Sequence, residues 1–159
     1  AFHTRPEATA DDHRIGLRLG LISPGLDMTM ESEGIRELER RDPWLGIEGG
    51  MEAIRLYAGD LERADWRISP IKGNLAALPP TLILAGGHDL LTPGSTQFAA
   101  MARDAGVDVR LEVEPHMFHV WPLLDMPEAR VARQRMVEYL RGSSHTSVSR
   151  PPRLSASAS

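Results

Sequence analysis

Residues 81–89, Thr-Leu-Ile-Leu-Ala-Gly-Gly-His-Asp, join an uninterrupted apolar run to a polar end. The β-branched and aliphatic residues at 81–85 show no polar alternation, which is typical of a strand covered on both faces in a parallel sheet. The two glycines that follow allow the backbone to bend sharply before Asp89. The segment therefore predicts a buried parallel strand with an acidic side chain just beyond its carboxyl end.

Two further strands are predicted on either side of this segment. Residues 17–23 form an apolar-rich run that ends at Pro24-Gly25, the pattern of a short buried strand and a turn. Residues 108–114 alternate Val109, Leu111 and Val113 with polar residues, so we expect a strand of period two at an edge of the sheet.

Helical spacing of apolar residues predicts helices over 32–40, 48–58, 92–105 and 127–141. The expected buried stripes are Ile35 and Leu38; Met51, Ile54 and Ala58; Phe98, Met101, Ala102 and Ala105; and Ala129, Ala132, Met136 and Leu140. The expected cap residues are Ser32 and Thr92, and Gly59, Gly106 and Gly142 are expected to close helices. The order predicts an α/β fold of parallel strands with right-handed helical crossovers and an incomplete sheet.

The two ends of the chain differ from the rest in composition. Residues 1–14 are polar and without periodicity, which indicates a loop or lead-in, and 142–159 are rich in serine and proline, which predicts a disordered tail. We therefore expect one partial domain over residues 1–141. Because the chain begins with Ala1 and not Met, we expect it to lie within a longer gene product.

Composition excludes several classes of function. A net charge of -4 disfavours nucleic acid as a partner, because phosphate backbones are bound by faces rich in Lys and Arg. No apolar run approaches the ~18 residues that would predict a membrane span, and no signal-peptide core is present. There is no cysteine, so thiolate chemistry is excluded and the compartment stays open; cytoplasmic is the default expectation. Nothing in the sequence predicts a cofactor.

The residues that predict chemistry are Asp89 and, 30 positions later, His119. Because functional groups gather beyond the carboxyl ends of parallel strands, we expect the two side chains to meet at one edge of the sheet. An aspartate after one strand and a histidine after the next is the order in which Ser-Asp-His hydrolases place their last two catalytic residues. Taken singly, each has a plainer interpretation, a turn carboxylate and a solvated or structural histidine.

Several ordered segments make the chain similar to the carboxyl-terminal half of the hormone-sensitive-lipase-like carboxylesterases, which are α/β-hydrolases. The segments are 21–27 (LISPGLD), 42–45 (DPWL), 69–75 (SPIKGNL), 78–81 (LPPT), 87–93 (GHDLLTP), 105–107 (AGV) and 117–121 (MFHVW). The resemblance covers roughly residues 17–141. It implies that Asp89 is the acid and His119 the base of a serine carboxylesterase acting on small acyl esters. It also implies that residues 31–68 flank the acyl pocket as cap helices.

The chain departs from that family at the nucleophile. It holds neither the Gly-x-Ser-x-Gly elbow nor the His-Gly-Gly oxyanion sequence, both of which the resemblance places before Ala1. Ser23 stands one position too far from its first glycine, and Ser95 falls at a predicted helix start, so neither is a credible substitute. His116 replaces a usual glycine and Gly25 a usual tryptophan, which predicts an altered catalytic loop. We expect this chain alone to be inactive.

Two other interpretations stay open. His88, Asp89, His116 and His119 would be good zinc ligands if their loops converged, although His-x-x-His on a loop is unspecific. The chain could also be a non-catalytic remnant that serves in interaction. In either case, we expect exposed sheet edges to promote self-association or pairing with a missing amino-terminal half.

Overall fold

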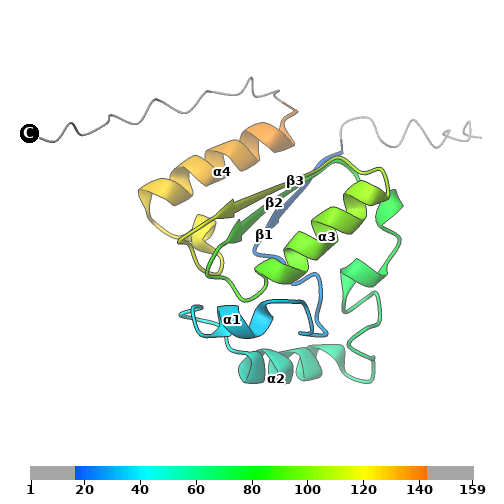
Figure 1. The fold of residues 1–159 in the computed structure, drawn as a ribbon. Helices are drawn as coiled ribbons and strands as arrows, with labels where there is room; N and C mark the ends of the chain where they lie inside the picture. The colour runs from blue at the N-terminus through cyan, green and yellow to red at the C-terminus, as the bar shows by residue number, and fades with distance from the viewer. Residues whose placement is uncertain (1–16, 143–159) are drawn as a thin grey trace, which may run out of the picture.

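The computed structural model describes residues 17–142 as three parallel strands with helices on both faces (Figure 1). In chain order the elements are β1 (Leu19–Ile22), α1 (Ile35–Glu39), α2 (Ile47–Ala58), β2 (Thr81–Gly86), α3 (Thr92–Asp104), β3 (Val109–Glu114) and α4 (Pro127–Leu140). Short 3-10 helices lie at Pro70–Lys72, Leu75–Ala77 and Trp121–Leu123. The lead-in predicted for residues 1–14 and the tail beyond Gly142 lie outside the described residues.

The sheet has the order β1-β2-β3, and both pairings are parallel. Thr81 lies opposite Leu19 on one side and Val109 on the other, so the three strands run in register from their amino-terminal ends. Every residue of β2 is buried, whereas in β3 only Val109 is buried and Val113 is 41% exposed, so the alternation expected for β3 is not seen in its burial. The buried central strand and the edge position of β3 are therefore confirmed.

Each face of the sheet is covered by one long helix (Figure 1). Phe98, Ala99 and Ala102 of α3 pack with Ile83 on one face, and a separate cluster on the other face joins Ala129, Ala132 and Met136 of α4 to Leu82 and Leu84. Burial of two such clusters supplies most of the driving force that holds the layers together.

The helices α1 and α2 lie beyond the carboxyl ends of the strands (Figure 1). Ile35, Ile54, Ala58 and Ile68 form a third cluster with Leu90, the residue that follows Asp89. Residues 31–68 therefore contain helices that pack against the turn after β2. Their assignment as a cap stays a prediction.

The structure corrects four details of the helices. Helix α1 begins at Ile35 after Gly34, and the Ser32 hydroxyl bonds to Asp27 instead of capping it. Thr92 is the first residue of α3 and its hydroxyl donates to the Gly86 carbonyl, so Leu91 is the cap.

Met101, Ala105 and Leu140 are exposed, and their predicted burial is wrong. Ser95, Ala99 and Tyr139 are buried instead, because the stripes of α3 and α4 are rotated relative to the predicted ones.

Candidate active site

Asp89 is held in the tight turn between β2 and α3. It is fully buried, and one of its carboxylate oxygens accepts the Leu91 N–H at 3.0 Å. The turn itself is closed by backbone bonds from Asp89 to Gly86 and from Thr92 to Asp89. A buried carboxylate needs hydrogen-bond or charge partners, and this turn supplies only part of them.

His119 supplies the missing partner. Its Nδ1 lies 3.3 Å from both carboxylate oxygens of Asp89, and its side chain is 21% exposed. The structure thus brings the two predicted residues together at the carboxyl edge of the sheet. A carboxylate that faces Nδ1 favours the tautomer with the proton on that nitrogen, which leaves Nε2 free to accept a proton.

Gly86 and Gly87 allow the two turns to approach each other this closely. A Cβ on Gly87 would lie 2.7 Å from the carbonyl carbon of Pro115, and one on Gly86 would lie 2.7 Å from that of Met117. Backbone bonds of 2.8 Å, Gly87 N–H to Glu114 and His88 N–H to Met117, join the turns. The predicted sharp bend is thus not the main reason for these glycines. They are needed because another backbone passes next to them.

A second carboxylate, Asp42, supports the turn from the side of the helices. One oxygen accepts the N–H groups of Trp44 and Leu45, at 2.8 and 3.0 Å, and the other accepts the Leu90 N–H at 2.7 Å. The sequence indicates Asp42 only as part of the segment 42–45 that resembles the esterase family, and indicates no role for it. Its position before Pro43 indicates a turn, but no local signal could show that it bonds a residue 48 positions away.

The residue before His119 is aromatic and contacts a second aromatic ring from the helical segment. Phe118 precedes His119, and its ring meets that of Trp44 edge-on with centroids 4.9 Å apart. Trp44 is 53% exposed and Leu123, three residues after Val120, is 61% exposed. Apolar side chains are thus exposed in the segment that follows His119 and in the one that contacts Phe118.

The structure gives no serine as a partner to His119 within the described residues. Ser23 is 5% exposed, and its oxygen accepts the Val120 N–H at 2.9 Å. Ser95 is fully buried in α3 and contacts the Pro24 carbonyl at 3.4 Å. Both hydroxyls are thus turned to the backbone, and that neither is the nucleophile stays a prediction.

The zinc alternative finds no support in residues 17–142, where no three His, Cys, Asp or Glu side chains are grouped as metal ligands. The rings of His88 and His116 face each other edge-on with centroids 6.0 Å apart, but Asp89 and His119 point at each other. The four side chains therefore do not converge in residues 17–142 as the zinc alternative would require.

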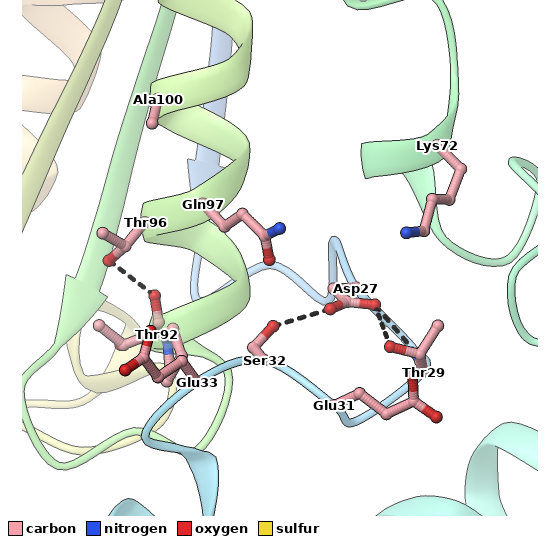
Figure 2. A pocket seen from close by; sticks show the side chains of 11 residues that line it. Asp27, Thr29, Glu31, Ser32, Glu33, Lys72, Thr92, Thr96, Gln97 and Ala100 are labelled. Carbon is pink, nitrogen blue, oxygen red and sulfur yellow. Dashed lines mark hydrogen bonds between the residues drawn. The ribbon is translucent and has the colours of Figure 1, made fainter.

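A cavity of about 740 Å³ opens between the loop after β1 and the outer face of α3 (Figure 2), and neither Asp89 nor His119 lines it. Asp27 stands at its centre. Burial raises the pKa of Asp27, but hydrogen bonds from Thr29 and Ser32 and the nearby Lys72 ammonium outweigh burial, so the pKa lies below its ordinary value. The Asp27 oxygens are thus occupied in holding their own loop.

Comparisons with known proteins agree with this architecture. The model of the alpha/beta hydrolase fold family matches residues 8–123. An esterase of Acinetobacter venetianus is 33% identical over 122 residues, which cover 75% of this chain and 40% of that protein. An acetyl-hydrolase of Streptomyces hygroscopicus is 31% identical over 124 residues, or 76% of this chain and 41% of the relative.

Solved structures give the same result. A hormone-sensitive lipase from a metagenome library superposes with a TM-score of 0.76 at 29% identity, over 80% of this chain and 44% of its own. An esterase from the bacterial hormone-sensitive lipase family superposes with a TM-score of 0.76 at 32% identity, over 79% and 43%.

The chain therefore carries an α/β-hydrolase fold with an aspartate and a histidine paired at the carboxyl edge of its sheet. It belongs to the alpha/beta hydrolase family, and the resemblance to its hormone-sensitive-lipase-like esterases is confirmed. The chain spans less than half the length of these relatives, in agreement with a partial domain. No helix within residues 17–142 has the length and apolar character that crossing a bilayer requires.

Proposed function

We propose that Asp89 and His119 are the acid and the base of a carboxylic ester hydrolase whose nucleophilic serine comes from polypeptide outside these 159 residues. The observation that carries the proposal is the contact of His119 Nδ1 with both oxygens of a fully buried aspartate. In the hydrolases that use this pair, the histidine takes the serine proton and later activates water against the acyl-enzyme.

Each residue then has a defined task. Asp89 holds the Nδ1 proton and stabilises the imidazolium that forms when Nε2 takes the proton of the serine hydroxyl. Nε2 returns that proton to the departing alkoxide, so an alcohol leaves and an acyl-serine remains. Water then loses a proton to Nε2 as it attacks the acyl carbon, and Nε2 gives that proton to the serine oxygen as the bond to the acyl group breaks and the acid is released.

The substrate class follows from the relatives and from the surface beside His119. The relatives are named esterase and acetyl-hydrolase. The ring of Phe118, the residue before His119, meets that of Trp44, and Trp44 and Leu123 are exposed apolar side chains. We therefore propose small, uncharged acyl esters as substrates.

The absence of a nucleophile is tested on the chain alone. We expect the purified 159-residue chain not to hydrolyse p-nitrophenyl butyrate above the buffer rate and not to be labelled by a serine-directed phosphonate. Labelling of Ser23, Ser95 or any other serine, with activity lost in His119→Gln, would place the nucleophile inside this chain and overturn that part of the proposal.

The catalytic roles are tested by transplanting residues 17–142 into the matching segment of the Acinetobacter venetianus esterase. We expect a chimera that melts cooperatively to hydrolyse p-nitrophenyl butyrate and to lose activity in His119→Gln. His88→Gln is the matched control, since His88 lies on the same edge but faces His116. A folded chimera that keeps its activity without His119, or loses it equally without His88, would contradict the assignment.

A further inference from the structure

Two residues with left-handed backbone conformation meet immediately behind the histidine. Val120, which follows His119, has φ 48° and ψ 24°, and Ser23, at the end of β1, has φ 44°. The Val120 N–H donates to the Ser23 hydroxyl oxygen at 2.9 Å, across 97 positions of sequence. A β-branched residue with positive φ is a true outlier, and such conformations persist only where the surroundings hold them.

The surroundings hold both residues to the sheet. Ser23 is 5% exposed, and its own N–H donates to the Leu84 carbonyl of β2 at 2.8 Å. On the far side of Val120, the Trp121 indole N–H donates to the Ala85 carbonyl at 3.3 Å. The short loop that carries His119 is therefore fixed to consecutive residues of the central strand, once through Ser23 and once through Trp121.

The bond to Ser23 acts on the peptide group that joins His119 to Val120. That group is planar, so fixing its N–H also fixes the bond that leaves the His119 Cα. The direction in which the imidazole leaves the backbone follows from this plane and from χ1. A donor on a peptide group that is not bonded to the His119 Cα would constrain the ring less directly.

We propose that Ser23 is a positioning residue for His119: its hydroxyl oxygen holds the strained Val120 peptide and thereby aims Nδ1 at Asp89. The catalytic value of this positioning rests on the proposed function. The contact between Ser23 and Val120 itself involves neither the substrate nor the nucleophile. The proposal also assigns a role to Ser23, a serine that is buried and turned away from solvent.

The test is the tautomer ratio of the neutral His119 ring in the full 159-residue chain, read from its nitrogen chemical shifts at a pH high enough that they no longer change with pH. We expect Ser23→Ala to lower the ratio of Nδ1–H to Nε2–H about tenfold, as expected for loss of about 1.4 kcal/mol of positioning. Ser23→Gly removes the hydroxyl as well but tolerates positive φ, so it answers the question should the alanine variant not fold.

The matched control is Ser95→Ala, which removes a second buried serine hydroxyl, one that bonds the Pro24 carbonyl and not the histidine loop. We expect its tautomer ratio to equal that of the parent chain, and the amide exchange of β2 to be unchanged in Ser23→Gly. An unchanged ratio in Ser23→Gly would overturn the proposal. So would a ratio that falls only in step with lost protection of β2, since that is the result of a purely structural role.

The ring measurement and the chimera separate the two proposals. A chimera that is folded but inactive would contradict the ester hydrolase, whereas the tautomer ratio would still decide the role of Ser23. In an active chimera, we expect Ser23→Gly to lower kcat and leave KM unchanged, because the serine acts on the base and not on substrate binding.

Discussion

Replacement of Asp42 by alanine removes the carboxylate that links the helical segment to the turn of the acid. Three backbone N–H groups lose their acceptor, those of Trp44, Leu45 and Leu90. Leu90 is 1% exposed, so its N–H cannot turn to water without opening the turn. A buried donor left without a partner costs about 1–3 kcal/mol, and loss of the acceptor for the two loop donors costs about 1 kcal/mol more.

We therefore expect Asp42→Ala to lower the free energy of unfolding by about 2–4 kcal/mol. For an m value of about 2 kcal/mol/M, the urea midpoint falls by roughly 1–2 M. Equilibrium unfolding followed by circular dichroism and tryptophan fluorescence measures the change. Asp60→Ala is the control, since Asp60 is an exposed aspartate just after α2, and we expect it to stay within about 0.5 kcal/mol of the parent chain.

A urea midpoint of Asp42→Ala equal to that of Asp60→Ala would refute this reasoning. Such a result would mean that the Leu90 N–H finds another acceptor at no cost, and that the turn carrying Asp89 is stable without its link to the helices.

Three more changes test other parts of the account. Gly87→Ala places a Cβ against the Pro115 backbone, so we expect a loss of about 1–3 kcal/mol in urea unfolding, and a neutral result would refute the close approach of the two turns. Phe98→Ala should cost about 3–5 kcal/mol, whereas Met101→Ala, at an exposed site, should cost under about 1; equal losses would contradict the orientation of α3. The pKa of Asp27 is lowered in the folded chain, although burial opposes the shift. The ionised carboxylate therefore stabilises the fold at pH values above its ordinary pKa of 3.8. This stabilisation is lost as the pH falls through the lowered pKa of the folded chain. Asp27→Asn should therefore lose stability at pH 7 but flatten the decline in the urea midpoint below about pH 4, and an unchanged acid profile would contradict the sign of that shift.

The sequence contains strong signals for the strands and for the pair. Residues 81–86 are apolar without alternation because both faces are covered, and this pattern is visible without coordinates. Asp89 and His119 could be paired by their order after consecutive strands, since parallel strands end at the same edge. The helix stripes were predicted only in part. Met101 and Ala102 are adjacent, and a rotation of the helix by one residue exchanges an exposed side chain for a buried one.

The supports of the pair could not be predicted, because they depend on contacts between distant segments. Ser23 and Val120 are 97 positions apart, and nothing in either local sequence indicates a positive φ for a valine. Asp42 and Leu90 are joined only because the cluster around Ile35 and Ile54 packs on the turn after β2. Such contacts follow from the packed layers and not from local propensity.

The most direct test of the central claim is a double-mutant cycle on kcat/KM for p-nitrophenyl butyrate in the chimera with the Acinetobacter venetianus esterase. If Asp89 and His119 act as one unit, Asp89→Asn and His119→Gln should each lower kcat/KM by about 10³–10⁴-fold, and the double variant should be no worse than the poorer single variant. Single variants that stay within about tenfold of the parent, or losses that multiply in the double variant, would contradict the account, because the two residues would then not share one catalytic task.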